Sequence, residues 1–155
     1  MLKKGDKVPE FNVLDDDERA FSEKDLIGAK TILYFYPKDM TPGCTVQGIN
    51  LSNNLDELQS KGYRVIGVSA DSVKRHCNFK AKTGIKFTLL ADESLDMIKS
   101  FGVWGLKKFM GREYEGIKRT TFLIDEKGVV ESVIEKVKTI SHTQQILELI
   151  EEKNK

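Results

Sequence analysis

One uninterrupted run of β-branched and aromatic residues, Thr31–Tyr36, constrains the fold of this chain most strongly. Such a run is typical of a strand that is buried on both faces of a sheet. Pro37 ends the run, because proline has no N–H to donate to a neighbouring strand. Arg64–Val68 is a second run of the same kind. Two buried strands with a helix-length segment between them favour a unit of parallel strands joined by a helix.

The joining segment has helical periodicity from near Pro42 to about Ser60. Apolar or small residues recur at alternating spacings of four and three, so one face of this helix is expected to pack on the sheet. The residues of that face are Cys44, Gly48, Leu51, Leu55 and Leu58.

The rest of the chain completes an α/β pattern. In order, we expect a hairpin around Asp15–Asp17, a helix capped by Asp71 or Ser72 that ends at Gly84, a strand at Phe87–Leu90, a helix after Asp92, an irregular segment at Gly102–Lys118, a strand at Thr121–Ile124, its antiparallel return at Val129–Ile134, and a helix at about Ser141–Lys153. This order predicts a thioredoxin-like three-layer sandwich, in which a central mixed β-sheet is flanked by helices, with an N-terminal hairpin and an inserted strand and helix. The length fits a single domain, residues 1–155.

Composition excludes several classes of function. Lys and Arg total 25 and Asp and Glu total 24, so nothing indicates a nucleic-acid partner. No apolar run approaches membrane-spanning length, and the basic start lacks an apolar signal segment, so we expect no membrane association and a cytoplasmic protein. A closed zinc site needs four Cys and His ligands at recognisable spacings, and the neighbours His76 and Cys77 are a poor pair. We therefore expect no metal and no cofactor. His76 is expected in core packing and His142 in solvent.

Cys44 occupies the position with the clearest chemical potential. It lies in the first turn of its predicted helix, just after a buried strand and a Pro-Gly turn. The free N–H groups and partial positive charge of a helix N-terminus favour a thiolate, which is the nucleophilic form of cysteine. The alternative is that Cys44 is a small core residue with no reactivity.

The residues around Cys44 resemble a known signature. Pro37, Thr41 and Cys44 are spaced as P-x-x-x-T-x-x-C, which is similar to the motif of the peroxiredoxins, and the stretch Phe35–Thr45 resembles their BCP/PrxQ subfamily. The likeness continues nearly to the end of the chain, at Gly67–Ser72, His76, Phe79, Gly102–Gly105, Gly111–Tyr114 and Arg119–Asp125.

This resemblance implies a role for each matching residue. Cys44 would be the peroxidatic cysteine, which attacks the peroxide, and Thr41 would hydrogen-bond the peroxide and the sulfur. Pro37 would shield the thiolate from water. Arg119 would lie beside Cys44 and stabilise negative charge on the sulfur and the departing oxygen, with Gln47 placed to brace it. Taken singly, Thr41 would be interpreted as a helix cap, Pro37 as a strand terminator, and Arg119 and Gln47 as surface residues.

The chain departs from the subfamily at one position. Many members carry a second cysteine five residues after the first, where this chain has Ile49. Cys77 is the remaining candidate for the resolving cysteine, which would condense with oxidised Cys44. At about 100° per residue, Cys77 points away from the core face shared by His76 and Phe79, so it should be accessible. Because both cysteines lie in predicted helices, we expect at least one helical turn to unwind before they join. The alternative is an uninvolved, half-exposed thiol.

The resemblance thus implies a thiol-dependent peroxidase that reduces hydrogen peroxide and organic hydroperoxides and is recycled by a thioredoxin-like reductant protein. It favours a monomer, although dimers occur among peroxiredoxins. Three alternatives stay open. One is a one-cysteine peroxidase recycled by an external thiol. Another is a non-enzymatic redox sensor. The third is a thiol–disulfide exchanger, which normally has a C-x-x-C motif, whereas Thr41 stands here in place of the first cysteine.

Overall fold

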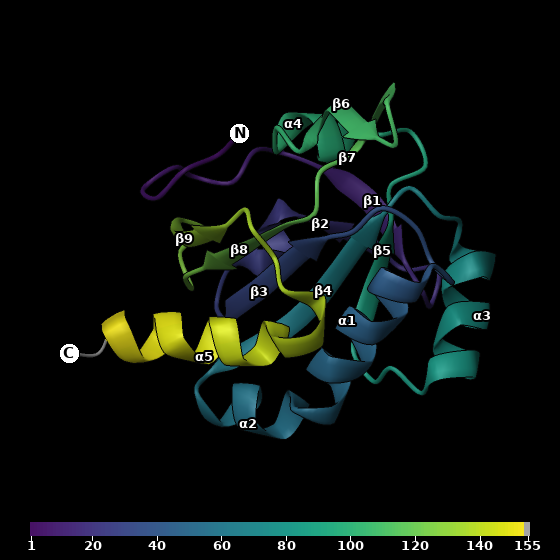
Figure 1. Cartoon of the computed structure of the whole chain (residues 1–155). Coiled ribbons are helices and arrows are strands. Elements are labelled where there is room, and N and C mark those ends of the chain that lie inside the picture. The colour runs from purple at the N-terminus through teal and green to yellow at the C-terminus, as the bar shows by residue number, and fades with distance from the viewer. Residues whose placement is uncertain (154–155) are drawn as a thin grey trace.

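The computed structural model describes residues 1–153, which build a seven-stranded mixed sheet in the order β2-β1-β5-β4-β3-β8-β9. Strand β3 lies inside the sheet between β4, to which it is parallel, and β8, to which it is antiparallel (Figure 1). The strands of the sheet are β1 (Asn12–Asp15), β2 (Ala20–Ser22), β3 (Lys30–Phe35), β4 (Tyr63–Ser69), β5 (Thr88–Ala91), β8 (Thr120–Ile124) and β9 (Val130–Ile134).

Helices cover both faces of this sheet. They are α1 (Pro42–Asn53), α2 (Leu55–Ser60), α3 (Val73–Thr83), α4 (Asp96–Ser100) and α5 (His142–Lys153), with short 3-10 helices η1 (Glu23–Leu26) and η2 (Thr139–Ser141). Successive residues of β3 point to opposite faces, as strand geometry requires. Ile32 and Tyr34 pack in the core beneath α1, α2 and α5, whereas Leu33 and Phe35 pack in a second core with α4. The predicted three-layer thioredoxin-like sandwich is confirmed.

The predicted helix 42–60 is divided in two at Asn54. Asn54 has φ −110° and ψ 15°, and its side-chain amide donates a hydrogen bond of 2.7 Å to the carbonyl of Asn50. Side chains of this type offer the backbone an alternative to continuous helix. The five residues of the predicted apolar face are nevertheless all buried.

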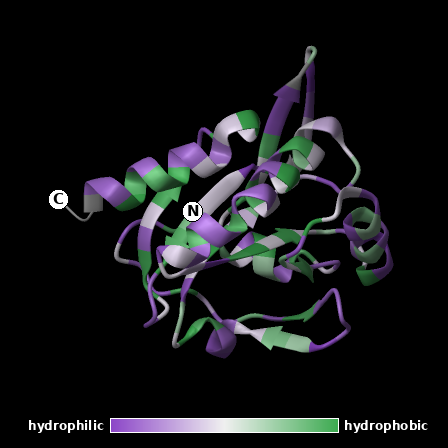
Figure 2. Cartoon of the chain, turned by 90° about the horizontal axis from the view of Figure 1, so that it is seen from below, coloured by the Kyte–Doolittle hydropathy of each residue, from purple (hydrophilic) through white to green (hydrophobic). Residues whose placement is uncertain are grey.

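Helix α3 begins and ends as its sequence predicts. The Ser72 hydroxyl accepts a hydrogen bond from the N–H of Arg75, and Gly84 ends the helix in the left-handed conformation, with φ 76°. Helix α5 alternates hydrophobic and hydrophilic residues along its length (Figure 2), so it buries one face against the sheet. Within residues 1–153, no helix has the length and apolar character needed to cross a bilayer.

The expectation of an irregular segment at 102–118 is wrong. Strands β6 (Trp104–Phe109) and β7 (Arg112–Ile117) pair there as an antiparallel hairpin outside the main sheet. Its turn contains Met110 and Gly111, which have φ 51° and 79°. Such a turn normally carries Asn-Gly or Asp-Gly, so Met-Gly gave no signal. The residues of β7 up to Glu115 are exposed, and the strand therefore lacks the alternation that marks a half-buried one.

Candidate functional site

Cys44 is the third residue of α1, where the chain enters the helix from the loop that follows β3. Its side chain is only 2% exposed, and it packs at the edge of the core beneath the helix. Pro42 at the first helical position suits this junction, because the backbone N–H that proline lacks would have no partner within the helix there. Burial at a helix start places the sulfur near unpaired backbone N–H groups and away from bulk water.

Arg119 reaches Cys44 from the connection between β7 and β8, 75 residues away in the chain. Its Nη2 donates to the Cys44 sulfur at 3.3 Å, and its Nη1 donates to Gln47 Oε1 at 2.5 Å. Gly43 allows this approach, since a Cβ at that position would lie 3.2 Å from Nη2. The guanidinium is thus held by Gln47 and aimed at the sulfur.

Gln47 is fully buried one turn after Cys44. Among the described residues, its Nε2 and the Tyr34 hydroxyl are the buried side-chain polar atoms that have no hydrogen-bond partner. Burial raises the pKa of Tyr34 well above its usual value, and the nearby charges of Cys44 and Asp39 raise it further. Tyr34 therefore remains a neutral phenol beneath the site.

Thr41 and Pro37 flank the loop that leads to Cys44. Thr41 occupies the cap position of α1, but its hydroxyl donates to the carbonyl of Lys38 at 2.8 Å and makes no capping bond. Pro37 lies two residues after the end of β3 and is half-buried. The structure therefore brings Arg119 to the sulfur of Cys44 and Gln47 to Arg119, and it places Thr41 and Pro37 in the adjoining loop.

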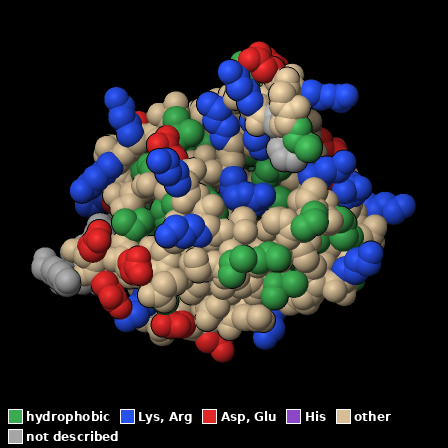
Figure 3. Space-filling model, viewed as in Figure 1, with side chains coloured by type: hydrophobic (Ala, Val, Ile, Leu, Met, Phe, Trp, Pro, Cys, Tyr) green, Lys and Arg blue, Asp and Glu red, His purple; other side chains and the backbone are tan. Residues whose placement is uncertain are grey.

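Lys107, on β6, adds positive charge near this site. Its Nζ donates to the carbonyl of Ile117 at 2.9 Å. Burial lowers the pKa of Lys107, and the positive charge of Arg119 lowers it further. Lys and Arg side chains gather on and below the β6–β7 hairpin (Figure 3). The hairpin thereby makes this region electropositive.

His142 is the clearest error of the sequence interpretation. Instead of facing solvent, its side chain is fully buried. Its Nε2 lies 2.8 Å from the Thr121 hydroxyl and its Nδ1 lies 3.0 Å from Gln145 Oε1, so Nδ1 carries the hydrogen and Nε2 accepts from Thr121. Burial lowers the pKa of His142 to about 4, and the charge of Arg119 adds to this effect. The helix start packs against α1, and the local sequence does not reveal that contact.

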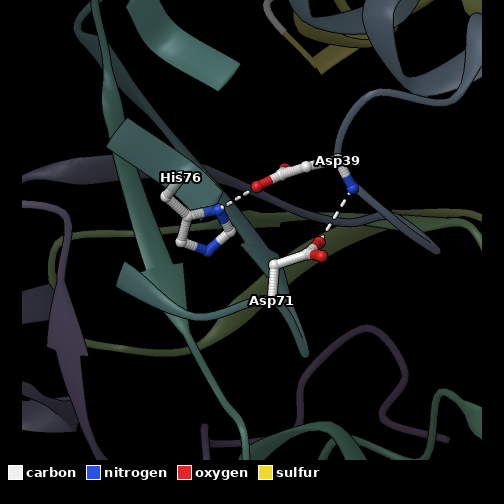
Figure 4. Close-up of side chains that lie close together, drawn as sticks. All are labelled: Asp39, Asp71 and His76. Atoms are coloured by element: carbon white, nitrogen blue, oxygen red, sulfur yellow. Dashed lines mark hydrogen bonds and ion pairs between the residues drawn. The ribbon is translucent and has the colours of Figure 1, made fainter. Parts of the chain in front are cut away.

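A buried polar cluster joins the loop before Cys44 to α3 (Figure 4). Asp39, Asp71 and His76 contribute side-chain atoms that lie within 4.8 Å of one another. Asp39 Oδ2 is 2.6 Å from His76 Nδ1, and the Asp39 N–H donates to Asp71 Oδ2 at 2.8 Å. These atoms could in principle hold a metal ion, but each already takes part in a hydrogen bond. Sequence reasoning placed His76 in the core without identifying its partners.

Cys77 lies on the exposed side of α3, as the helical spacing predicts. Its Sγ donates to the carbonyl of Asp16 at 3.2 Å. In the described part of the chain both cysteines are free thiols, Cys44 buried and Cys77 exposed.

Comparison with known proteins identifies relatives over nearly the whole chain. Residues 4–133 match the AhpC/TSA family. Peroxiredoxin Bcp of Escherichia coli K12 is 44% identical over 151 residues, which cover 97% of each chain. Among solved structures, peroxiredoxin Q of Xanthomonas campestris superposes with a TM-score of 0.85 at 34% identity, covering 94% of this chain and 92% of that one. PrxQ of Xylella fastidiosa superposes with a TM-score of 0.91 at 29% identity, covering 100% and 99%.

Proposed function

The chain belongs to the AhpC/TSA family, among its Bcp and peroxiredoxin Q members, and is a thiol-dependent peroxidase; from this premise we propose that Cys44 is the residue that attacks the peroxide. The observation that carries the assignment is the contact of 3.3 Å between Arg119 Nη2 and the Cys44 sulfur, at a buried helix start. Cys77 is exposed and has no arginine among its hydrogen-bond partners in the described chain.

The first chemical step transfers one oxygen atom to sulfur. The Cys44 thiolate attacks one peroxide oxygen, an S–O bond forms, and the O–O bond breaks. Both electrons of that bond leave with the second oxygen, which takes up a proton and departs as water or an alcohol. Cys44 is left as a sulfenic acid. Negative charge moves from the sulfur to the leaving oxygen, and the Arg119 guanidinium, braced by Gln47, is oriented to stabilise it.

Thr41 and Pro37 act on the substrate and its surroundings. Because the Thr41 hydroxyl donates its hydrogen bond to the carbonyl of Lys38, its oxygen can accept a hydrogen bond from the O–H of a hydroperoxide. This arrangement orients the peroxide with its free O–H toward Thr41 and its O–O bond toward Cys44. Pro37 contributes a ring without an N–H, which limits access of water to the thiolate.

Cys77 resolves the sulfenic acid. Its sulfur attacks the sulfur of Cys44, the S–O bond breaks, and the hydroxyl leaves as water with the proton of the Cys77 thiol. The product is a Cys44–Cys77 disulfide, which a thioredoxin-type dithiol reduces by exchange. The bacterioferritin comigratory protein of Xanthomonas campestris has alkyl peroxide reduction activity, which supports organic hydroperoxides as substrates alongside hydrogen peroxide. We assign the active form as a monomer.

Intact mass after treatment with one equivalent of hydrogen peroxide tests these roles. We expect the reduced protein to lose about 2 Da, and a Cys77→Ser variant to gain about 16 or 32 Da instead. A Cys44→Ser variant should keep its mass. A gain of 16 or 32 Da in the unmodified sequence would exclude the resolving role of Cys77. It would favour the one-cysteine alternative, which also agrees with Cys44 being buried and Cys77 being exposed on another helix. An unchanged mass would remove the peroxidase assignment of Cys44.

A further inference from the structure

We propose that Asp39 and His76 are positioning residues that tie the loop carrying Thr41 to the helix carrying Cys77, and so govern when Cys44 can leave its buried site. The inference rests on the proposed roles of Cys44 and Cys77. It concerns how the two halves of the reaction are coupled, and neither residue touches the reacting sulfur.

Asp39 is anchored through every polar group that it has. Its carboxylate accepts a hydrogen bond from the Tyr36 hydroxyl at 2.5 Å and lies 2.6 Å from His76 Nδ1. Its N–H donates to Asp71 Oδ2 at 2.8 Å, and its carbonyl accepts from Arg75 Nη2 at 3.3 Å. Its side chain is fully buried. The middle of the loop is thus held by Asp71, in the connection between β4 and α3, and by α3 itself (Figure 4).

His76 forms an ion pair with Asp39 inside the protein. Its ring is fully buried, and its Nε2 lies 2.8 Å from the carbonyl of Leu90. Both ring nitrogens therefore face oxygen acceptors, and both can donate only in the imidazolium form. Burial alone would lower the pKa of His76, but the hydrogen bond and charge of Asp39 raise it above the usual value. Removing one partner of a buried ion pair is strongly destabilising, because the other is left uncompensated.

The residue after Asp39 shows what the anchor holds in place. Met40 has φ 71°, the left-handed conformation that a residue with a side chain adopts only at a cost. Thr41 follows, with its hydroxyl turned back to Lys38, and α1 begins one residue later. Once Asp39 is released, the side-chain contact that still spans Met40 among the described residues is the exposed hydrogen bond from Thr41 to Lys38, so Met40 can leave its strained conformation. The loop can then relax and free the first turn of α1.

The same contacts reach the resolving cysteine. His76 and Arg75, which hold Asp39, are the two residues before Cys77 on α3. Cys44 is 2% exposed and Cys77 faces outward, so both must move before their sulfurs can bond. Unwinding of α3 at Cys77 displaces Arg75 and His76, the partners of Asp39. The same local unfolding that frees Cys77 therefore also releases the loop before Cys44. Until that opening, the reduced protein keeps Cys44 beside Arg119, where it reacts with peroxide.

A test without peroxide measures the release of the loop directly. In a Cys77→Ser background, we would follow modification of Cys44 by N-ethylmaleimide by intact mass, and amide hydrogen exchange over residues 37–43. Asp39→Asn and His76→Gln should each accelerate both processes about tenfold or more, since hydrogen bonds between charged groups are lost. The double variant should be no faster than the faster single variant, because the two residues act as one pair.

Lys80→Met is the matched control. Lys80 lies one turn after His76 on α3, and its side chain pairs with Asp16 at 2.8 Å and not with the loop that carries Asp39. This variant should leave the modification and exchange rates unchanged. In proteins that retain Cys77, Asp39→Asn should form the disulfide faster after oxidation and react with peroxide more slowly, a split that a general loss of stability would not produce.

Two outcomes would overturn the proposal. One is modification and exchange in Asp39→Asn that are no faster than in Lys80→Met, and the other is an equal slowing of oxidation and disulfide formation. Asp39→Asn decides the matter if His76→Gln fails to fold, because asparagine keeps an oxygen for the Tyr36 hydroxyl. Failure of the proposed function would appear differently, as a lack of disulfide in the unmodified sequence whatever the rate of loop release.

Discussion

Replacing Gln47 by methionine should slow the reaction with peroxide without weakening the fold. Gln47 Oε1 accepts the Nη1 hydrogen bond that holds the Arg119 guanidinium, whose Nη2 lies 3.3 Å from the Cys44 sulfur. Methionine has a similar length and suits a buried position, but it offers the guanidinium no comparable acceptor. The substitution therefore removes the brace while leaving Arg119 and Cys44 intact.

The expected size of the effect follows from these contacts. A net hydrogen bond to a charged group contributes about 1.5–3 kcal/mol, and we take the lower end because Arg119 is partly exposed to water. At about 1.4 kcal/mol for each factor of ten, the second-order rate constant for oxidation of Cys44 should fall about tenfold. Removing the guanidinium itself, in Arg119→Met, should reduce it about 10²–10³-fold, as for other oriented donors.

The Gln47→Met substitution should leave the stability of the fold unchanged or raise it, although it slows the reaction. Gln47 Nε2 is buried without a hydrogen-bond partner in the described chain, and leaving such a group unsatisfied costs about 1–3 kcal/mol. Methionine removes that donor, so the denaturation midpoint of Gln47→Met should be unchanged or higher. A slower reaction in an equally stable protein separates positioning of Arg119 from general damage.

Quenched-flow mass spectrometry at constant pH measures the oxidation rate of each variant under excess peroxide. Val46→Ala serves as the control, because Val46 precedes Gln47 on the same helix and is 40% exposed. In an Arg119→Met background, Gln47→Met should have little further effect, since the brace then has nothing to hold. An unchanged rate in the single variant, or the same tenfold fall without Arg119, would refute the reasoning.

Three further predictions concern stability. The pKa of His142 is about 4 in the folded protein and 6.5 in the unfolded chain, so the unfolded chain binds more protons between these two pH values. The free energy of unfolding should therefore fall by at most about 3 kcal/mol as the pH drops through this window. A His142→Gln variant should lack this pH-dependent component in urea titrations. Gly67→Ala should lose about 1–3 kcal/mol, because the new Cβ would lie 2.8 Å from Leu89 Cδ2 in the core, and an unshifted urea midpoint would contradict this. Ser72→Ala should lose about 1 kcal/mol and speed hydrogen exchange in the first turn of α3, whereas unaltered exchange would mean that the Ser72 cap is dispensable.

Much of the fold was accessible from the sequence because it is encoded locally. Continuous apolar runs predicted β3 and β4, the spacing of apolar residues predicted the buried face of α1 and α2, and Ser72 and Gly84 predicted the ends of α3. Each of these signals depends on residues within one or two turns or on one strand. The β6–β7 hairpin escaped prediction because the exposed residues of β7 do not alternate with buried ones and its turn sequence, Met-Gly, is not a typical one.

The family signature predicted which residues would matter, and the structure shows which contacts they make. Thr41 and Pro37 lie close to Cys44 in sequence, so their nearness needed no tertiary information. Arg119 needed it, because only the antiparallel pairing of β8 with β3 brings a residue 75 positions away to the start of α1.

The sequence by itself determined where the helices and buried strands lie and which cysteine stands at a helix start, since periodicity and capping act over short distances. Only the tertiary structure decided that His142 is buried and neutral and that Asp39 pairs with His76. It also decided between the two interpretations of Gln47, as a brace for Arg119 and as a surface residue, in favour of the brace. The reason is physical: the charge state and partners of a polar side chain depend on its burial and on residues distant in the chain, and packing of the elements sets both.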